Sequence, residues 1–484
     1  MYSKVKPVSK VSQPLGYSVP SRGNTLIQAF WIFVAVLLLW AIFNLKTSSL
    51  DSIIGAALIS FTALLPSYLW SSGKALGMPL FPLFALTYLW TYAIQLVDNN
   101  PTVINYSPGS QLFCSVTVAG FLGLGTFIWF QFVNSAPRPP KYYRAFSSQE
   151  AEPFFLFSLA TGILFIMNSL GGWFALDGGV FALIRGVLLA FNALGIFILA
   201  YHWGNRKLSK NKSLCFLVLL IVYAITNAAS LLLVVAVSGF LLAIVAFTIS
   251  RRQVPLLPII LVVFCFMFLH SGKSEMRSNH WADNEATYVQ PWQYPDLYAE
   301  WIGYSLKHSN KPPAPEEGEQ SGLERSSLIH LLLMAQDKTP RDVPYLFGGS
   351  YAIIPQLLVP RFMTSNKIRS HEGTYLLNIH YGLQTREEAY KTTIGWGLLN
   401  EAYANFGLLG CVGMAVILGA GYGQATRWRM NTPLLSSRSL FTILLISYAS
   451  QSEYSAGVYV AALFQSIVPL VVVSLLFMKV YRTE

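Results

Sequence analysis

The feature that most constrains this chain is a series of long apolar blocks separated by short polar connections. A helix of about 20 apolar residues crosses the roughly 30 Å hydrocarbon core of a membrane. Inside that core every backbone polar group must be bonded within the protein, which favours helices. The sequence therefore predicts an all-α polytopic membrane protein. We expect spans at residues 25–45, 50–70, 79–97, 112–133, 153–174, 180–203, 213–230, 231–250, 254–270, 394–424, 437–453 and 457–478.

The charge content excludes a soluble multidomain enzyme and a disordered chain. Charged residues make up 11% of the sequence, whereas soluble globular proteins carry about 25%. The net charge of +11 is unevenly placed: residues 271–391 hold 12 Lys and Arg against 14 Asp and Glu, and the remainder holds 21 against 8. The basic excess lies in short connections between apolar blocks, as the positive-inside rule predicts. We therefore expect the lipid bilayer, and not nucleic acid, as the partner of these charges.

The same charges predict the topology. The N-terminal tail is basic, whereas residues 98–111 and 172–179 contain no Lys or Arg. Dividing the long apolar stretch 213–250 near Asn227 and Ser230 keeps the basic residues of 206–212 in the cytoplasm. Twelve spans with both termini cytoplasmic satisfy every connection. The predicted regions are a cytoplasmic tail (1–24), spans one to nine (25–270), an extracytoplasmic segment (271–391), and three last spans with a short cytoplasmic tail (392–484).

Two helices and one broken apolar piece are expected within the extracytoplasmic segment. The first helix, at 296–306, carries an apolar face, and the second carries four apolar residues on one side. These residues are Tyr298, Trp301, Ile302 and Leu306 in the first helix, and Leu328, Leu331, Leu332 and Ala335 in the second. Residues 343–363 are apolar but interrupted by Gly and Pro, which predicts an interfacial or re-entrant piece rather than a further span.

Several common catalytic motifs are missing from the sequence. It contains no GxxxxGK[ST] phosphate-binding loop, no Gly-x-Ser-x-Gly elbow and no Asp-x-Asp pair, and its four cysteines lack metal-ligand spacing. We therefore expect no cofactor and no metal ion. This pattern favours a reaction whose donor arrives already activated and embedded in lipid.

Four residues are candidates for catalysis. Arg277 and Arg361 lie where the extracytoplasmic segment meets the membrane, and a guanidinium binds phosphate oxygens bidentately while staying charged. His371 is a candidate acid or base. Glu401 lies inside an apolar block, where a carboxylate is costly and needs a protein or water partner. It is a candidate general base, and a buried partner for an arginine is the alternative.

Five further residues are candidates for substrate binding. Asn405 shares a helix face with Glu401 at a spacing of four residues. The other four are basic, and anchoring at the lipid headgroups is the alternative explanation for them. They are Lys273, Lys367, Arg369 and Arg185.

Five segments carry a family resemblance by their order and spacing. They are GMPLFPLF (77–84), GKSEMR (272–277), PYLFGGSY (344–351), PRFMTSNK (360–367) and GWGLLNEAYANFG (395–407). With one large loop between late spans, the chain resembles the bacterial O-antigen polymerase family within the O-antigen ligase/polymerase superfamily. Related ligases place a His and an Asn, Ser or Gln where this chain has Trp396 and Gly397, which argues against a ligase.

The resemblance implies a metal-independent glycosyltransferase of the bacterial cytoplasmic (inner) membrane. Its partners would be undecaprenyl-pyrophosphate-linked oligosaccharides, polymerised at the outer face into O-antigen, capsule or exopolysaccharide, with a chain-length regulator as an optional partner. Family arginines that hold pyrophosphate correspond to Arg361 and Arg277. The alternatives left open are an O-antigen ligase and a transporter, or flippase, of lipid-linked oligosaccharides.

Overall fold

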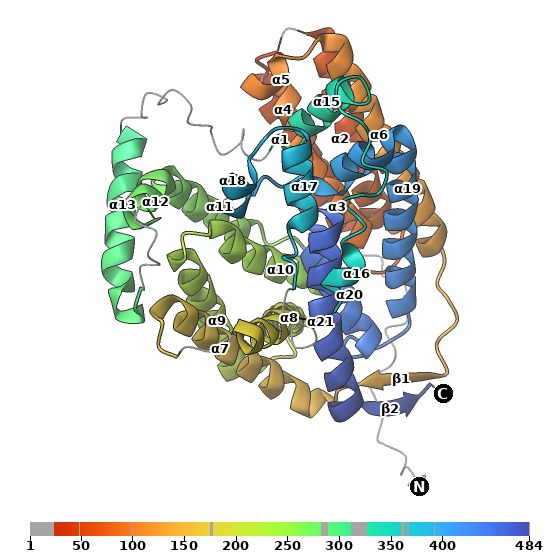
Figure 1. Cartoon of the computed structure of the whole chain (residues 1–484). Coiled ribbons are helices and arrows are strands. Elements are labelled where there is room, and N and C mark those ends of the chain that lie inside the picture. The colour runs from red at the N-terminus through yellow and green to blue at the C-terminus, as the bar shows by residue number, and fades with distance from the viewer. Residues whose placement is uncertain are drawn as a thin grey trace.

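The computed structural model describes residues 24–47, 49–98, 100–174, 178–281, 289–310, 327–359, 364, 367–391 and 393–483. Within these residues nearly all regular structure is helical, and the helices are gathered side by side (Figure 1). The long apolar elements are α1 (Asn24–Phe43), α2 (Leu50–Ser71), the continuous run of α3 (Leu80–Tyr88), η1 (Leu89–Ala93) and α4 (Ile94–Val97), α6 (Pro108–Val133), α7 (Ser148–Gly171), α8 (Gly178–Gly204), α9 (Lys210–Ala229), α10 (Leu233–Arg251), α19 (Gly397–Arg429) and α21 (Ala456–Phe477).

The spans confirm the predicted class, and the predicted number of about twelve stays a prediction. In the described part of the chain, ten helices are long and apolar enough to cross a membrane. An eleventh is broken, because α11 (Leu256–Ser271) bends by 51° into α12 (Lys273–Trp281). The eleventh predicted segment, 437–453, forms α20 (Ser437–Ala449), which has only 13 residues. The chain is thus an all-α polytopic membrane protein, whose described residues form ten or eleven full-length candidate spans and one shorter apolar helix.

The remaining elements are short. They are α5 (Pro101–Ile104), η2 (Pro291–Gln293), α13 (Tyr294–Asn310), α15 (Ile329–Lys338), α16 (Ile354–Leu357), α17 (Glu372–His380), α18 (Arg386–Lys391), β1 (Tyr142–Ala145) and β2 (Lys479–Arg482). The two strands pair antiparallel, with Tyr143 opposite Tyr481. This pairing joins the connection before α7 to the residues after α21.

The predicted division of residues 213–250 is confirmed. α9 ends at Ala229 and α10 begins at Leu233. The Asn227 amide donates to the carbonyl of Tyr223 (2.7 Å), and the Ser230 hydroxyl donates to the carbonyl of Asn227 (2.6 Å). Such side-chain bonds compete with the helical ones and favour a helix end.

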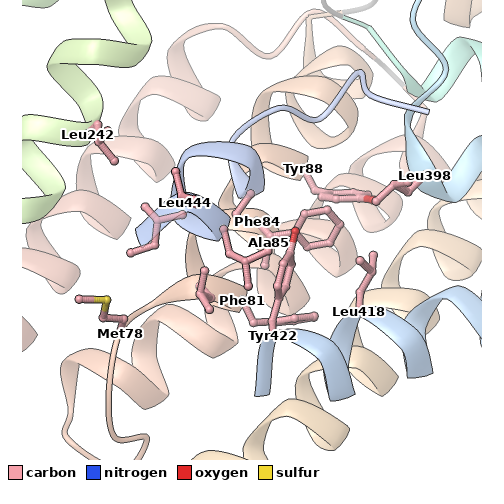
Figure 2. Packing of buried hydrophobic residues seen from close by; sticks show 14 of the residues in the cluster. Met78, Phe81, Phe84, Ala85, Tyr88, Leu242, Leu398, Leu418, Tyr422 and Leu444 are labelled. Atoms are coloured by element: carbon pink, nitrogen blue, oxygen red, sulfur yellow. The ribbon is translucent and has the colours of Figure 1, made fainter. Parts of the chain in front are cut away.

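Close packing of α3, α6 and α19 forms the centre of the main apolar cluster (Figure 2). The Phe81 ring stacks on Trp129, with ring centroids 5.9 Å apart, and also meets Tyr422 edge-on. A Cβ built on Gly419 would lie 2.6 Å from the carbonyl oxygen of Gly125. Small residues let the two backbones approach, which is a usual source of packing energy between membrane helices.

A second apolar cluster joins α12 and α13 to the ends of α9 and α10. In Figure 1, α13 lies at one edge of the molecule and α19 lies toward the opposite edge. Trp301 is fully buried, and its indole nitrogen donates to the carbonyl of Leu269 (2.7 Å). The predicted helix is confirmed, and its apolar face is only partly buried within the protein, since Ile302 and Leu306 are 42% and 51% exposed. Burial of the large indole instead turns Tyr294 and Leu297 inward.

The second predicted helix of the extracytoplasmic segment is α15, and its apolar side is buried as expected. Leu328, just before it, and Leu331, Leu332 and Ala335 within it are at most 3% exposed. Residues 343–359 contain one helix of four residues, α16, which agrees with the expected broken piece.

The basic connections lie at one end of the helices, which we call the basic end: residues 72–79, 134–147, 205–209, 252–255 and 430–436. They are tied by backbone bonds from Leu76 to Val133 and from Phe146 to Leu435, and by the ion pair of Lys212 with Glu152 (2.6 Å). The opposite end, which we call the covered end, holds residues 98–107, 450–455 and the described part of 327–391. This grouping agrees with the predicted alternation, and which end faces the cytoplasm stays a prediction.

Candidate functional site

The structural centre of the covered end is a break in α19. Phe406 and Gly407 have non-helical backbone angles, with φ of −141° and +61°. The break leaves two helix carbonyls without helical partners. The backbone amides of Leu346 and Phe347 donate to them, at Ala404 and Asn405 (both 3.1 Å). Irregular backbone within a span is tolerated where protein covers it, and here residues 344–350 provide the cover.

Glu401 and Asn405 lie on the same face of α19 just before this break and share one partner. The Ser350 hydroxyl donates to one carboxylate oxygen of Glu401 (2.7 Å), and the Asn405 amide donates to the Ser350 oxygen (2.8 Å). The other carboxylate oxygen accepts from the backbone amide of Ala456 (2.5 Å). All three polar side chains are fully buried. The Glu401 carboxylate thus lies at the N-terminus of α21, where the helix dipole favours a negative charge.

This geometry favours a positioning role for Glu401. Among the described residues its partners are a hydroxyl and a backbone amide, not the arginine that was the alternative. Its role as a general base stays a prediction. The sequence did not identify Ser350, because the Gly-Gly-Ser turn that contains it carries no local sign of a partner about 50 residues away in α19.

Further buried bonds fix the cover on the spans. Asn400 donates to the carbonyl of Leu328 and accepts from the Tyr92 hydroxyl (both 2.8 Å). The Thr374 and Ser455 hydroxyls are 2.8 Å apart, joining α17 to the residue before α21. The first bond joins Leu328 of the cover to α19, the second joins α19 to η1, and the third joins α17 to the start of α21. The Leu328 amide also donates to the Thr91 carbonyl (2.9 Å), so the cover is fixed to η1, α19 and α21.

Two exposed arginines flank one aromatic ring on this cover. The guanidinium carbons of Arg369 and Arg386 lie 4.7 Å and 5.8 Å from the ring centroid of Tyr390. Arg386 also pairs with Glu372 (3.0 Å). His371 lies beside Tyr375, whose ring is 5.0 Å from that of Tyr390. We call Arg369, His371, Arg386 and Tyr390 the arginine cluster.

The arginine cluster contains a neutral imidazole at ordinary pH. Neighbouring protein removes water from His371 and lowers the pKa of its imidazole below the usual value. A neutral imidazole can accept a proton, which suits a general base. The sequence singled out Arg369 and His371, but it missed Arg386 and Tyr390, which lie in a short helix joined to them only in the folded chain.

A second charged group lies at the start of α21. Loss of water raises the pKa of the Tyr454 phenol, the nearby Glu453 carboxylate raises it further, and the charge of Arg185 lowers it. The charges of Glu453 and Arg185 thus both act on Tyr454, and a Cβ added to Gly186, the residue after Arg185, would lie 3.6 Å from the Gln465 Cβ of α21. Loss of water also raises the pKa of the Glu453 carboxyl, as suits an acid or base. The sequence missed Glu453, which lies in a short polar connection without a recognisable motif.

Both groups adjoin the first turns of α21. A Cβ on Gly457, in the first turn, would lie 3.4 Å from the carbonyl oxygen of Ser370, the residue between Arg369 and His371. The structure therefore gathers Arg369 and His371 on one side of this helix end and Arg185 and Glu453 near the same end.

Lys367, one of the predicted basic residues, has local structural contacts. The Lys367 ammonium donates to the carbonyls of Leu357 (2.9 Å) and Val359 (2.5 Å) at the end of α16. It thereby ties together the two sides of the segment that contains Arg361, and Arg361 itself lies outside the described residues.

Arg277 and Lys273 lie on α12, in the region of the second apolar cluster. The Arg277 guanidinium donates to the carbonyl of Leu231 (2.8 Å), in the break between α9 and α10. The structure thus ties Arg277 to this helix break rather than to the arginine cluster.

No group of three or more His, Cys, Asp or Glu side chains that could hold a metal ion occurs in the described part of the chain. All four cysteines are free. No protein-family model, curated protein or solved structure matches this chain.

Proposed function

We propose that this chain is a membrane-embedded glycosyltransferase that polymerises oligosaccharide repeats linked to undecaprenyl pyrophosphate at the outer face of the bacterial inner membrane. The resemblance of its five sequence segments to O-antigen polymerases supports this proposal. The observation that carries it is the arginine cluster, which presents two exposed guanidinium groups beside the end of a membrane span. A lipid-linked pyrophosphate is confined to that depth, and bidentate arginines suit its oxygens.

The proposed reaction is a substitution at the anomeric carbon of the donor sugar. The bond from this carbon to the pyrophosphate oxygen breaks, and a bond to an acceptor hydroxyl oxygen forms. Arg369 and Arg386 stabilise the negative charge that develops on the departing pyrophosphate. The hydroxyl proton passes to His371 or Glu453, the two exposed groups near α21 with suitable protonation chemistry. Arg361 and Arg185 are further candidates for contacts with phosphate.

Glu401 takes part indirectly in this proposal. Its carboxylate, Ser350 and Asn405 hold the cover and the start of α21 together, so they fix the distance between the arginine cluster and Glu453. Such preorganisation matters because small displacements of catalytic groups have large effects on rate.

The same geometry gives less support to the two alternatives, a ligase and a transporter. Trp396 stands where ligases carry a titratable residue, and it is fully buried with its indole nitrogen bonded to Asn378. Transporters often use broken helices to bind substrate or ions. At the break in α19, the carbonyls of Ala404 and Asn405 already accept from the backbone amides of Leu346 and Phe347, so the break does not require an ion to satisfy them.

The test is complementation of a deletion strain of the bacterium that encodes this chain, read as a polysaccharide gel. The Arg369→Ala/Arg386→Ala double variant should lose the ladder of long chains while single repeats remain attached to the final acceptor. Arg341→Ala is the matched control. Like Arg386, Arg341 is an exposed arginine of the same segment paired with one carboxylate, Asp342 at 2.9 Å, and it lies outside the cluster.

The gel also separates the alternatives. Polymer that accumulates on the carrier lipid in the deletion strain would indicate a ligase, and repeats stranded in the inner leaflet would indicate a flippase. A full ladder in the double variant at normal abundance would contradict the proposed site. Carrier-linked repeats extracted from the deletion strain then provide a substrate for the purified protein, on which His371→Gln and Glu453→Gln can be compared.

A further inference from the structure

A cavity lies at the basic end, far from the arginine cluster along the helices. Its volume is about 610 Å³, within the usual range for sites that hold small ligands. It is lined by the first turn of α1, the C-terminal end of α8 and the C-terminal end of α10. The residues that carry the argument are Thr25, Arg206, Arg251, Arg252 and Gln253.

The lining of this cavity is strongly basic. It contains three arginines and no acidic side chain. Arg206, Arg251 and Arg252 are exposed, and none of them takes part in an ion pair recorded between described residues. The two helix C-termini contribute about half a negative charge each, which is less than the three guanidinium charges. The cavity therefore favours an anion.

The backbone around the cavity is held in place by specific contacts. Arg206 and Arg252 adopt the left-handed conformation, with φ of +56° and +57°, where each chain leaves its helix. The Ser250 hydroxyl donates to the carbonyl of Tyr201 (2.6 Å), and Thr25 donates to the carbonyl of Arg252 (2.8 Å). These bonds join α8 to α10 and α10 to α1. A conformation rare for residues with side chains persists where the surrounding structure determines it.

α1, the third helix that lines the cavity, indicates that the ligand is a lipid. α1 is among the most apolar spans, yet only 6% of its apolar window is buried within the protein. Exposed apolar side chains such as Trp31 and Phe33 follow the cavity along α1. A molecule with a phosphate headgroup and acyl chains would meet the arginines and this apolar helix together. Basic pockets between spans are known sites for anionic lipid headgroups.

We propose that this cavity binds the phosphodiester headgroup of an anionic phospholipid, with the acyl chains lying along α1. The bound lipid joins α1 to α8 and α10, in addition to the bond of Thr25 to the Arg252 carbonyl after α10. This site is separate from the proposed glycosyltransferase site and does not depend on it.

The test measures lipid binding by the full-length protein purified in a neutral detergent, with short-chain phosphatidylglycerol as the probe. The Arg206→Gln/Arg251→Gln/Arg252→Gln variant should bind at least tenfold more weakly. The matched control, Lys74→Gln/Arg138→Gln/Lys141→Gln, removes three charges from the same end outside the cavity. It should bind within twofold of the unchanged protein. The affinity should also fall as salt is added.

Two other probes identify the source of the phosphate. Phosphatidylcholine of the same chain length and inorganic phosphate should each bind at least tenfold more weakly than phosphatidylglycerol. Equal binding of inorganic phosphate would overturn the lipid assignment, and equal binding of phosphatidylcholine would overturn the role of charge. If the glutamine variant does not fold, the triple Arg→Lys variant keeps the charge but loses the bidentate geometry. It should then bind with reduced affinity, and unchanged affinity would contradict the proposal.

Discussion

The two halves of the predicted extracytoplasmic segment attach to the membrane helices in different ways. Residues 273–310 reach helix ends from outside: Arg277 and Trp301 donate to carbonyls where spans stop or break. Residues 327–391 are instead joined to buried polar groups inside spans, with Ser350 bonded to Glu401. The second kind of attachment leaves less freedom, because each buried group must keep its partner. The arginine cluster lies on this more tightly held half.

Loss of the Glu401 carboxylate should have the largest effect. Glu401→Ala leaves the Ser350 hydroxyl and the Ala456 amide without their acceptor in a buried place, and should lower the free energy of unfolding by about 4 kcal/mol. Denaturant titration in mixed micelles measures this. The isosteric Glu401→Gln separates the two roles of the residue. An inactive variant of unchanged stability would indicate a general base, whereas parallel loss of both indicates positioning.

Closing the break in α19 should be the next most costly change. Gly407→Ala places a methyl group 2.8 Å from the Tyr345 hydroxyl at a backbone conformation that only glycine adopts readily. We expect a loss of about 3 kcal/mol, measured in the same titration. Gly413→Ala, later in the same helix, is the control, since a Cβ there meets nothing within 4 Å. Similar stabilities for the two variants would show that the break is not fixed by this contact.

Loss of a contact made by residues 273–310 should lower the free energy of unfolding by less. Arg277→Ala removes the bond to the Leu231 carbonyl and should cost about 2 kcal/mol. Glycan polymerisation per molecule of folded protein should be unchanged, as measured with extracted carrier-linked repeats. A loss of activity without a loss of stability would restore Arg277 as a catalytic residue and would contradict the contrast between the two halves.

The smallest effect should be a pH dependence at His371. Its folded-state pKa is lowered by loss of water, so the unfolded chain takes up the proton first as the pH falls. Its contribution to stability is therefore present above about pH 6.5, the ordinary value, and is lost as the pH falls toward the folded-state pKa. If His371 is the base, the acid limb of the activity profile has its midpoint below about pH 6.5. An identical acid limb in His371→Gln would exclude that role.

The candidate site was predictable only in part. Arg369 and Arg185 were selected because basic residues near span ends suit a phosphate, and His371 was selected as a candidate acid or base. The fold gathers all three with Glu453 near one end of α21. Arg386 and Glu453 were missed, since neither lies in a motif. Arg277, Lys367 and Arg369 are all basic residues near predicted span ends, but folding bonds the first two to backbone carbonyls. A single sequence does not distinguish a lysine that bonds to a carbonyl from one that contacts a substrate.

The sequence by itself determined where the apolar helices lie, including the division between α9 and α10. Apolar length and charge are local properties, and the membrane imposes the same length and charge preferences on every span. Only the tertiary structure decided that α20 is short, that α19 breaks at Gly407 and that Ser350 is the partner of Glu401. Those features depend on which distant backbone groups remain unbonded after packing, and buried polar groups take whichever partner the fold brings within reach.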